Sequence, residues 1–281
     1  MKQGYYLAID IGASKIRLGV IDTFGDVHSA KTIATNTEDP EKSLEIMEAE
    51  IEALKSRFKL LACGVGCPGP LDLKAGKILD TPNLGKWNGL SVVDEIRKMG
   101  RFKVFLDRDS HNALRGERWL GELRGVTEGI MITWGSGVGG SIMMDGRIYY
   151  GPGGIAGELG HIIVNADGDQ CSLGHRGCLE SFIGGKAVER KYGESLADIC
   201  QKARDKQSVA IKITDEISKY LNQALETYIQ IFNPQKIIIG GAVTRSLPLF
   251  LNNKSNSRVV ASSLGSDAGF FGAALLAMEN R

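Results

Sequence analysis

The sequence predicts an α/β fold built from two similar lobes. Short apolar runs rich in strand-forming residues alternate with amphipathic helical segments, which is the order expected for mixed sheets covered by helices. In addition, one pattern occurs twice. An apolar run ends at Gly12 and another at Gly135, and an aspartate follows ten residues later in each copy, at Asp22 and Asp145. The interval between the copies is far too long for a solenoid, so we expect a duplicated domain.

The first half of the chain carries five predicted strands and three predicted helices. Apolar runs of strand length lie at residues 5–12, 15–22, 25–35, 60–66 and 103–107. Helical signals lie at residues 39–58, 90–100 and 110–121. The first of these helices is the clearest. Asp39 suits its N-cap, Pro40 suits its first turn, and apolar residues recur at steps of three and four.

The second half repeats this organisation. Strands are predicted at residues 128–135, 141–146 and 236–241, and a long helix at residues 208–231. We therefore expect a first lobe over residues 1–107, a second lobe over residues 108–267, and a closing helix at 268–281 that packs on the first lobe.

Composition and charge narrow the class of function. The chain has 281 residues, of which 24% are charged, and a formal net charge of +1 without a long basic run, so we expect neither nucleic acid nor an anionic membrane as partner. No apolar stretch reaches the ~20 residues of a membrane span, and Asp10 comes too early for a signal-peptide core. These features predict a cytoplasmic protein. Its five cysteines are expected to be reduced thiols.

Three glycine turns follow apolar runs, and they predict a nucleotide site. They lie at residues 12–14, 135–140 and 240–241. Backbone N–H groups approach phosphate where side chains are small, although each turn alone is also typical of a tight hairpin. The segment "GSGVGG" lacks the dinucleotide-binding spacing and precedes a strand, and the chain has no Walker loop. We therefore expect a nucleotide site of another kind, in a cleft between the lobes.

Several segments together resemble the ROK family (repressors, open reading frames and sugar kinases) of the actin-like ATPase superfamily. In chain order they are "LAIDIGASKIRLGVID", "GVGCPGPLD", "TPNLGKWNG", "GELGH", "GHRGCLES" and "IIIGG". The resemblance implies duplicated actin-like (ribonuclease H-like) ATPase domains with an interlobe cleft, and a homodimer. It also implies transfer of the γ-phosphate of ATP, with Mg²⁺, to the hydroxymethyl group of a hexose-type sugar such as glucose or N-acetylmannosamine.

For the nucleotide, the resemblance implies that Asp10 positions Mg²⁺ and that residues of the three glycine turns contact the nucleotide. Those near phosphate are Gly12, Ala13, Ser14, Lys15, Gly135, Ser136, Gly137 and Gly139. Those near adenosine are Gly240 and Gly241. Ala13 and Ser14 replace the more usual Gly and Thr, and both are small enough to keep the turn. Lys15 has an alternative role as an ordinary solvated lysine.

The resemblance places Asp109 on the catalytic base, which accepts the proton of the sugar hydroxyl as its oxygen attacks the γ-phosphorus. From the residues alone, a helix cap is an equally suitable role. Arg108 stands where the family has Asn, and His111 stands where it has a second Asn. Because arginine only donates hydrogen bonds, two interpretations of Arg108 are open. It forms a local ion pair with Asp107 or Asp109, or it binds the carboxylate of an acidic sugar such as 2-keto-3-deoxygluconate.

For the sugar, the resemblance implies that carboxylates and a histidine hold its hydroxyls, with a weaker addition from the other lobe. The residues concerned are Glu158, His161, Glu180 and Asn83. A non-catalytic, sugar-sensing regulator is the alternative from another class. The family's repressors carry an additional N-terminal DNA-binding module, for which a first strand near Tyr5 leaves no room. A sensor without DNA binding stays open.

The loop at residues 161–178 resembles the family's zinc loop, in which a histidine joins three thiolates. The matching ligands are His161, Cys171 and Cys178, and Leu173 replaces the middle thiolate. Four-coordinate zinc needs one more ligand, which His175 can supply. In the alternative interpretation, zinc has been lost, Leu173 packs in its place and His175 is a surface residue. Both interpretations are open.

Overall fold

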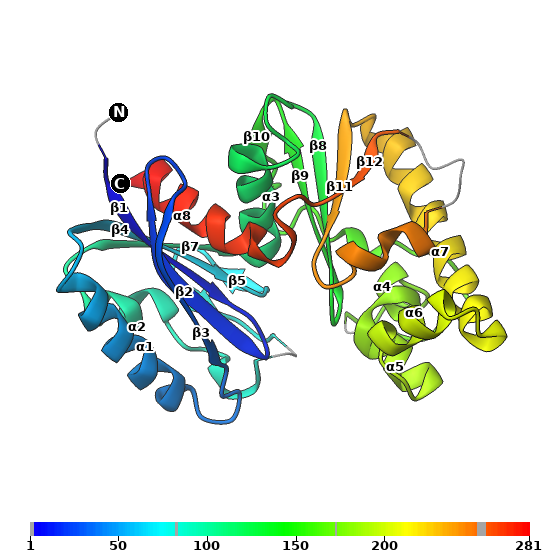
Figure 1. Cartoon of the computed structure of the whole chain (residues 1–281), viewed down its shortest axis with the longest axis horizontal. Coiled ribbons are helices and arrows are strands. Elements are labelled where there is room, and N and C mark those ends of the chain that lie inside the picture. Colours follow the sequence, from blue (N-terminus) through cyan, green and yellow to red (C-terminus); the bar gives the residue numbers. More distant parts are fainter. Residues whose placement is uncertain (1–2, 82–83, 172, 252–256) are drawn as a thin grey trace. The chain divides into compact units, whose positions relative to one another are not determined.

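The computed structural model describes residues 3–81, 84–171, 173–251 and 257–281 (Figure 1). The chain divides into two compact units, one formed by Met1–Gly121 with Asp267–Arg281 and the other by Glu122–Ser266. Each unit is built on a five-stranded sheet with helices beside it, so the predicted α/β class is confirmed. Among the helices in the described ranges, none combines the length and the apolar composition that crossing a membrane requires.

The first unit contains a mixed sheet with the strand order β3-β2-β1-β4-β7. Its strands are β1 (Tyr5–Ile11), β2 (Lys15–Asp22), β3 (Val27–Ala34), β4 (Leu60–Cys67) and β7 (Lys103–Arg108), with a separate short hairpin of β5 (Leu71–Asp72) and β6 (Lys77–Ile78). β2 is antiparallel to both of its neighbours, whereas β1, β4 and β7 are parallel. The three parallel strands therefore end at the same edge of the sheet.

Helices cover both faces of this sheet (Figure 1). They are α1 (Pro40–Lys55), α2 (Val92–Met99), α3 (Asp109–Leu120) and α8 (Ala268–Asn280), and a 3-10 turn, η1, spans Gly85–Trp87. Side chains alternate along β1, so Leu7 and Ile9 lie in the core with α1 and α2, whereas Ala8 packs against Phe270 of α8. The alternation assigns Asp10 to the same face of the sheet as Ala8.

The local sequence signals correctly predict where helix α1 begins and which of its faces is buried. It begins at Pro40 with Asp39 at its N-cap, as the sequence predicts, although the Asp39 side chain makes no capping hydrogen bond. Met47, Ile51 and Leu54 are buried on its inner face. The apolar period therefore identifies the face that packs on the sheet.

Glycines allow α8 to lie directly on its neighbours. A Cβ at Gly64 of β4 would lie 1.8 Å from the carbonyl oxygen of Ala273, and a Cβ at Gly272 would lie 1.6 Å from the carbonyl oxygen of Asn112. Because α3 packs along α8 in this way, α3 belongs to the first unit. The division of the chain consequently falls after Gly121, whereas the sequence places the boundary at residues 107–108.

The second unit repeats the topology of the first, with the strand order β10-β9-β8-β11-β12. Its strands are β8 (Gly129–Trp134), β9 (Val138–Met144), β10 (Arg147–Ile148), β11 (Lys236–Gly240) and β12 (Val259–Ala261). β8 is antiparallel to β9 and parallel to β11, just as β1 is antiparallel to β2 and parallel to β4. The duplication that the sequence predicts is therefore present in the sheets.

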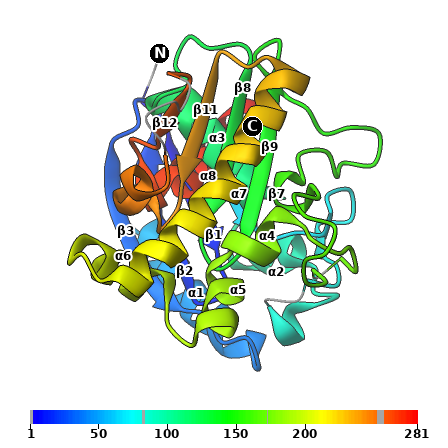
Figure 2. The same ribbon diagram turned by 90° about the vertical axis from the view of Figure 1, so that its right-hand side faces the viewer.

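The helices of the second unit are α4 (Leu179–Ile183), α5 (Gly185–Tyr192), α6 (Leu196–Arg204) and α7 (Ser208–Phe232), and its 3-10 turns include η2 (Leu159–His161), η3 (Thr244–Leu249) and, at the junction with α8, η4 (Gly265–Asp267). Figure 2 shows α7 running beside the strands of this sheet. Its Leu221 and Tyr228 share one core with Ile132 and Trp134 of β8. The sequence predicts α7 but makes no prediction for α4–α6, which are short.

Candidate functional site

In the first unit, the parallel strands bring acidic residues to one edge of the sheet. Asp10 of β1 is paired with Gly66 of β4, and Gly66 is paired with Asp107 of β7. Ligand sites of parallel sheets commonly lie at this carboxyl edge. A Cβ at Gly66 would lie 3.0 Å from both Asp10 Oδ1 and Asn112 Nδ2. Glycine at this position therefore leaves room for a carboxylate and an amide side by side.

Asp10 carries the clearest electrostatic perturbation of the site. Its carboxylate is partly exposed but lies deep among protein atoms, and a Cβ at Gly269 of α8 would lie 2.9 Å from its Oδ2. Burial, followed by the negative charge of Asp109, raises the pKa of Asp10 to about 7, while Lys15 and Arg17 oppose the shift. Two neighbouring carboxylates in such a place suit a hard divalent cation, because Mg²⁺ prefers oxygen ligands and would offset their repulsion.

Asp109 is the first residue of α3, and the N-cap of this helix is Arg108. Asp109 is therefore not the N-cap residue of this helix, which the helix-cap interpretation requires. Its Oδ1 accepts a hydrogen bond from the backbone N–H of Ser110 at 2.6 Å. At the start of a helix, the N–H dipoles favour the charged carboxylate, which is the form that accepts a proton.

Arg108 is buried, with 7% of its surface exposed, and its side chain lies beside Gly69, where a Cβ would be 3.5 Å from Nε. Its backbone N–H donates to Asp107 Oδ1 at 2.8 Å. The same carboxylate contacts the side chains of Arg115 and His111 at 2.6 and 2.7 Å. Sequence reasoning missed these two partners of Asp107, although their four-residue spacing places them on one helical face.

The turn between β1 and β2 is tied to the end of β3. The backbone N–H of Gly12 donates to Lys15 O at 2.9 Å, which closes the turn. Thr35 reaches both sides of it, because its Oγ1 donates to Gly12 O and its N–H donates to Ser14 O. Ala13 thus lies in a short hairpin turn beside Asp10, as the sequence predicts. The phosphate contacts implied for this turn stay a prediction.

The corresponding turn of the second unit is shorter than the sequence predicts. Val138 already pairs with Trp134 in the sheet, so β9 begins there instead of at residue 141, and Gly139 lies in the strand. The turn itself consists of Gly135, Ser136 and Gly137. The backbone N–H groups at the start of α5 donate to the carbonyl oxygens of the first two.

Glu180 of α4 lies against this turn. Its Oε2 accepts a hydrogen bond from the backbone N–H of Val138 at 2.8 Å, and a Cβ at Gly137 would lie 2.4 Å from the same oxygen. The turn therefore orients a carboxylate as well as connecting two strands.

Gly240 ends β11, and Gly241 follows with a φ of 94°, which favours glycine. A Cβ at Gly241 would lie 2.4 Å from Trp134 O.

The sugar-binding residues expected in the second unit come from two connected segments. Glu158 is the N-cap of η2, and His161 ends this turn with its N–H donating to Glu158 O at 3.0 Å. The backbone N–H of Leu179 donates to Ile162 O at 2.9 Å, which joins this segment to the helix that bears Glu180. Asn83, predicted to add to the site, lies outside the described residues.

Three of the residues expected to bind zinc do come together. The donor atoms of His161, Cys171 and Cys178 lie within 4.8 Å of one another, and the two sulfurs are 3.2 Å apart. His161 Nδ1 is buried and makes no hydrogen bond with any described residue. Burial and the neighbouring Cys171 thiol raise the pKa of Cys178 to about 12. An imidazole nitrogen without a partner beside two thiols is a donor set that fits zinc.

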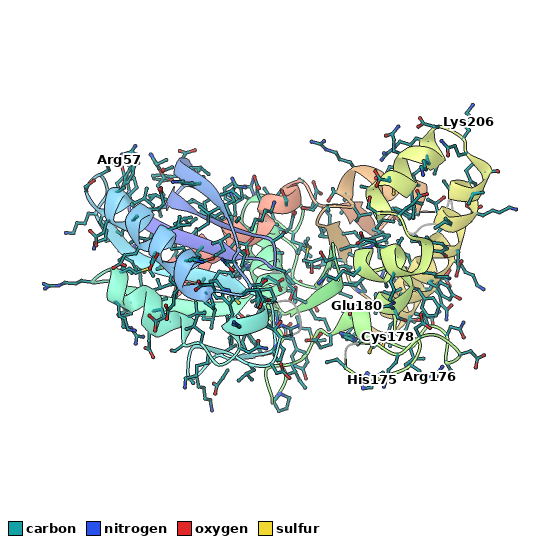
Figure 3. All side chains as sticks on the ribbon, turned by 90° about the horizontal axis from the view of Figure 1, so that it is seen from below. Arg57, His175, Arg176, Cys178, Glu180 and Lys206 are labelled. Atoms are coloured by element: carbon teal, nitrogen blue, oxygen red, sulfur yellow. The ribbon has the colours of Figure 1, made fainter. Side chains whose placement is uncertain are left out.

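The structure corrects two expectations about the rest of this loop. His175 is exposed and is not brought into the donor group found among the described residues. Figure 3 shows it with Arg176 at the outer edge of the loop that leads to Cys178 and Glu180. Leu173 is also exposed, at 54%, so it does not pack where the missing thiolate would be. The described residues therefore bring together three of the four groups expected to bind zinc, and His175 is not among them.

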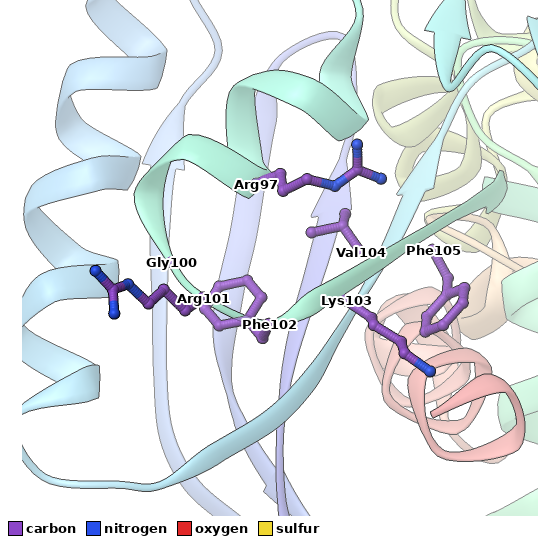
Figure 4. Close-up of a pocket in the computed structure, with 7 residues that line it drawn as sticks. All are labelled: Arg97, Gly100, Arg101, Phe102, Lys103, Val104 and Phe105. Carbon is purple, nitrogen blue, oxygen red and sulfur yellow. The ribbon is translucent and has the colours of Figure 1, made fainter.

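A surface depression of about 650 Å³ lies at the opposite end of β7 (Figure 4). It is lined by Arg97, Gly100, Arg101, Phe102, Lys103, Val104 and Phe105. These residues lead into β7 from α2, whereas Asp107, Arg108 and Asp109 follow at its carboxyl end. The depression is therefore separate from the candidate site.

Two sheets of one topology, each with a glycine turn between its first two strands in chain order, define a duplicated actin-like (ribonuclease H-like) α/β protein. The chain belongs to the ROK family, whose profile matches residues 6–280. It is 30% identical to the glucokinase of Thermotoga maritima over 97% of both chains. The structure of a ROK family glucokinase from Streptomyces griseus in complex with glucose and AMPPNP matches with a TM-score of 0.82 and 26% identity, covering 99% of this chain and 100% of that one. The xylose repressor of Caldicellulosiruptor bescii is 29% identical over 88% of this chain and 68% of the repressor.

Proposed function

We propose that this protein is an ATP- and Mg²⁺-dependent kinase that phosphorylates the hydroxymethyl group of a hexose-type sugar such as glucose. The observation that carries the proposal is the pair of acids, Asp10 and Asp109, at the carboxyl edge of the first sheet, close enough that one raises the pKa of the other. The similarity to glucokinases along nearly the whole chain supports it. Membership of the family would not by itself support a kinase, since repressors also belong to the family.

In the proposed reaction, Asp109 accepts the proton of the sugar hydroxyl as the hydroxyl oxygen attacks the γ-phosphorus. The bond from this phosphorus to the bridging oxygen of the β-phosphate breaks, and ADP leaves. The start of α3 suits the task of Asp109, because the N–H groups at a helix N-terminus favour a negatively charged carboxylate over a neutral one. Asp10 is the proposed ligand of Mg²⁺, directly or through water, and the ion when bound neutralises charge on the phosphates. The turns at residues 12–14 and 135–137 are proposed to hold phosphate, together with Lys15 and Gly139 in the strands that follow them. Gly240 and Gly241 are proposed to lie near adenosine.

For the sugar, we propose that the carboxylates of Glu158 and Glu180 accept hydrogen bonds from its hydroxyls and that His161 makes a further hydrogen bond to one of them. The two expected roles of His161 are compatible. If zinc binds Nδ1, the other ring nitrogen stays available for a hydroxyl, and the metal fixes the orientation of the ring. The hydrogen bond from the backbone N–H of Val138 restrains the carboxylate of Glu180. Zinc would thus act on sugar binding rather than on the chemical step.

An ATP-consumption screen tests the proposal. Glucose, N-acetylmannosamine and N-acetylglucosamine are offered with 2-keto-3-deoxygluconate, and consumption of ATP in the presence of one of the hexoses is expected. Asp109→Asn should abolish transfer while sugar binding, measured by calorimetry, stays within about twofold. Binding of a sugar without any transfer by the unmodified protein would instead favour the sugar-sensing regulator.

Arg108 supports one second candidate, a kinase for an acidic sugar. A buried guanidinium next to the proposed base is a suitable partner for a substrate carboxylate. Arg108→Asn should then weaken turnover of 2-keto-3-deoxygluconate strongly, and should only perturb turnover of a neutral hexose.

We also propose that the protein is a homodimer, as the family resemblance implies. Light scattering on the purified protein tests this.

A further inference from the structure

The start of α3 contains a buried polar network next to Asp109. Asp107, His111 and Arg115 follow one another at intervals of four residues, and their exposed fractions are 2%, 0% and 6%. Charged groups are rarely buried to this extent unless other groups pair with them. These side chains therefore need an explanation beyond packing.

Every oxygen of the Asp107 carboxylate has a partner. Oδ1 accepts from the backbone N–H of Arg108 at 2.8 Å and lies 2.7 Å from His111 Nδ1. Because an ionised carboxylate only accepts hydrogen bonds, His111 Nδ1 carries the proton. Oδ2 lies 2.6 Å from Arg115 Nη1, so the negative charge is compensated by a guanidinium on the same helix.

Arg115 is itself held in place from several elements. Its Nη1 donates to Asn112 Oδ1 at 3.0 Å, and Asn112 Nδ2 donates to the carbonyl of Val65 in β4 at 3.2 Å. Its Nε lies 3.6 Å from Glu279 Oε2 of α8. The network thus connects β7, α3, β4 and α8.

The network holds the chain on both sides of the proposed base. Arg108 and His111 stand on either side of Asp109 in the sequence, and both donate to the same oxygen of Asp107. We propose that Asp107, His111 and Arg115 are positioning residues that fix the backbone at the start of α3, and with it the carboxylate of Asp109. This inference rests on the proposed function. A displacement of about 1 Å at a reacting group lowers turnover by up to ~10²-fold.

Two pairs of variants test the inference in the full-length protein. His111→Leu removes the donor to Asp107, whereas His111→Asn keeps one, because the amide nitrogen of Asn occupies nearly the position of His Nδ1. Arg115→Met removes the guanidinium from Asp107, whereas Arg118→Met removes a guanidinium that contacts Glu279 from the same helix. Thermal unfolding identifies variants that retain the fold.

The readouts are kcat, KM for ATP and for the accepted sugar, and amide hydrogen exchange of residues 107–112. His111→Leu and Arg115→Met should lower kcat tenfold or more with KM changed less than threefold, and should speed exchange of the Arg108 amide at least tenfold. His111→Asn should recover most of both effects. Arg118→Met should stay within twofold of the unmodified protein in kcat.

Unchanged kcat and unchanged exchange in folded His111→Leu and Arg115→Met would overturn the inference. So would an equal loss in His111→Leu and His111→Asn, because the size of the ring and not its donor would then matter. If the unmodified protein phosphorylates no sugar, the proposed function fails separately. The exchange of the Arg108 amide still decides whether the network fixes the backbone around Asp109.

Discussion

Replacing Asp10 by Asn should stabilise the protein at neutral pH while it removes the proposed metal ligand. Burial and the charge of Asp109 raise the pKa of Asp10 from 3.8 to about 7, which means that the folded state holds the proton more tightly than the unfolded chain does. The stability that this proton contributes is complete below about pH 4. It is lost as the pH rises from 4 to 7, because ionisation then favours the unfolded chain.

The size of the effect follows from the two pKa values. A tenfold difference in proton affinity is worth about 1.4 kcal/mol, so the ionised carboxylate disfavours folding by up to ~4 kcal/mol above pH 7. Because the group is partly exposed, water screens part of this, and we expect ~2 kcal/mol. Asn has nearly the shape of a protonated Asp and carries no charge. The Asp10→Asn protein should therefore match the unmodified protein near pH 4 and exceed its free energy of unfolding at pH 8.

Urea unfolding of both proteins between pH 4 and 8 measures this difference directly, since other titrating groups affect both proteins alike. Adding Mg²⁺ at pH 8 should stabilise the unmodified protein and leave Asp10→Asn unchanged, because the cation relieves the repulsion between Asp10 and Asp109. A difference in stability that does not vary with pH, or a less stable Asp10→Asn protein at pH 8, would refute the reasoning.

Three further predictions concern packing, metal content and the sugar site. Gly64→Ala should lower the free energy of unfolding by about 3 kcal/mol in urea, because its Cβ would collide with a carbonyl of α8, whereas Gly153→Ala, whose Cβ would make an ordinary contact with Ile155 Cγ1 at 3.9 Å, should change it by less than ~1 kcal/mol. Metal analysis should find about one zinc per chain in the unmodified protein and none in Cys178→Ser, which should also unfold at a lower temperature; equal metal content in both would exclude the thiol as a ligand. Gly137→Ala should displace the Glu180 carboxylate and raise KM for the sugar about tenfold, and an unaltered KM for the sugar would argue against a role for Glu180.

Local patterns in the sequence were sufficient for the class of fold. The helix predicted at residues 39–58 is α1, since its apolar period and Pro40 act within a few residues of the chain. The repeated strand–turn–strand pattern corresponds to two sheets with the same strand order. It could be recognised because alternating apolar residues and glycine turns are also local features of the sequence. Asp10 and Asp109 were identified as candidate acids from motifs that resemble the ROK family. Asp10 lies near the end of β1 and Asp109 follows β7, and parallel strands bring such residues to one edge of the sheet.

Contacts between distant segments could not be read in this way. The loop with His161, Cys171 and Cys178 was visible from its residue types, but the exposure of His175 and Leu173 depends on how the loop folds back on itself. Likewise, the boundary at Gly121 follows from the packing of α3 on α8, which joins residues more than a hundred positions apart. No local propensity encodes such a contact.

By itself, the sequence determined the α/β class and the duplication, because both depend on local periodicity, and its resemblance to the ROK family identified Asp10 and Asp109 as candidate acids. Only the tertiary structure decided what surrounds these acids. It set Gly66 and Gly269 against Asp10, and it bound Asp107 to Arg115. The physical reason is that pKa values and buried ion pairs depend on distances across elements, which the order of residues along the chain does not specify.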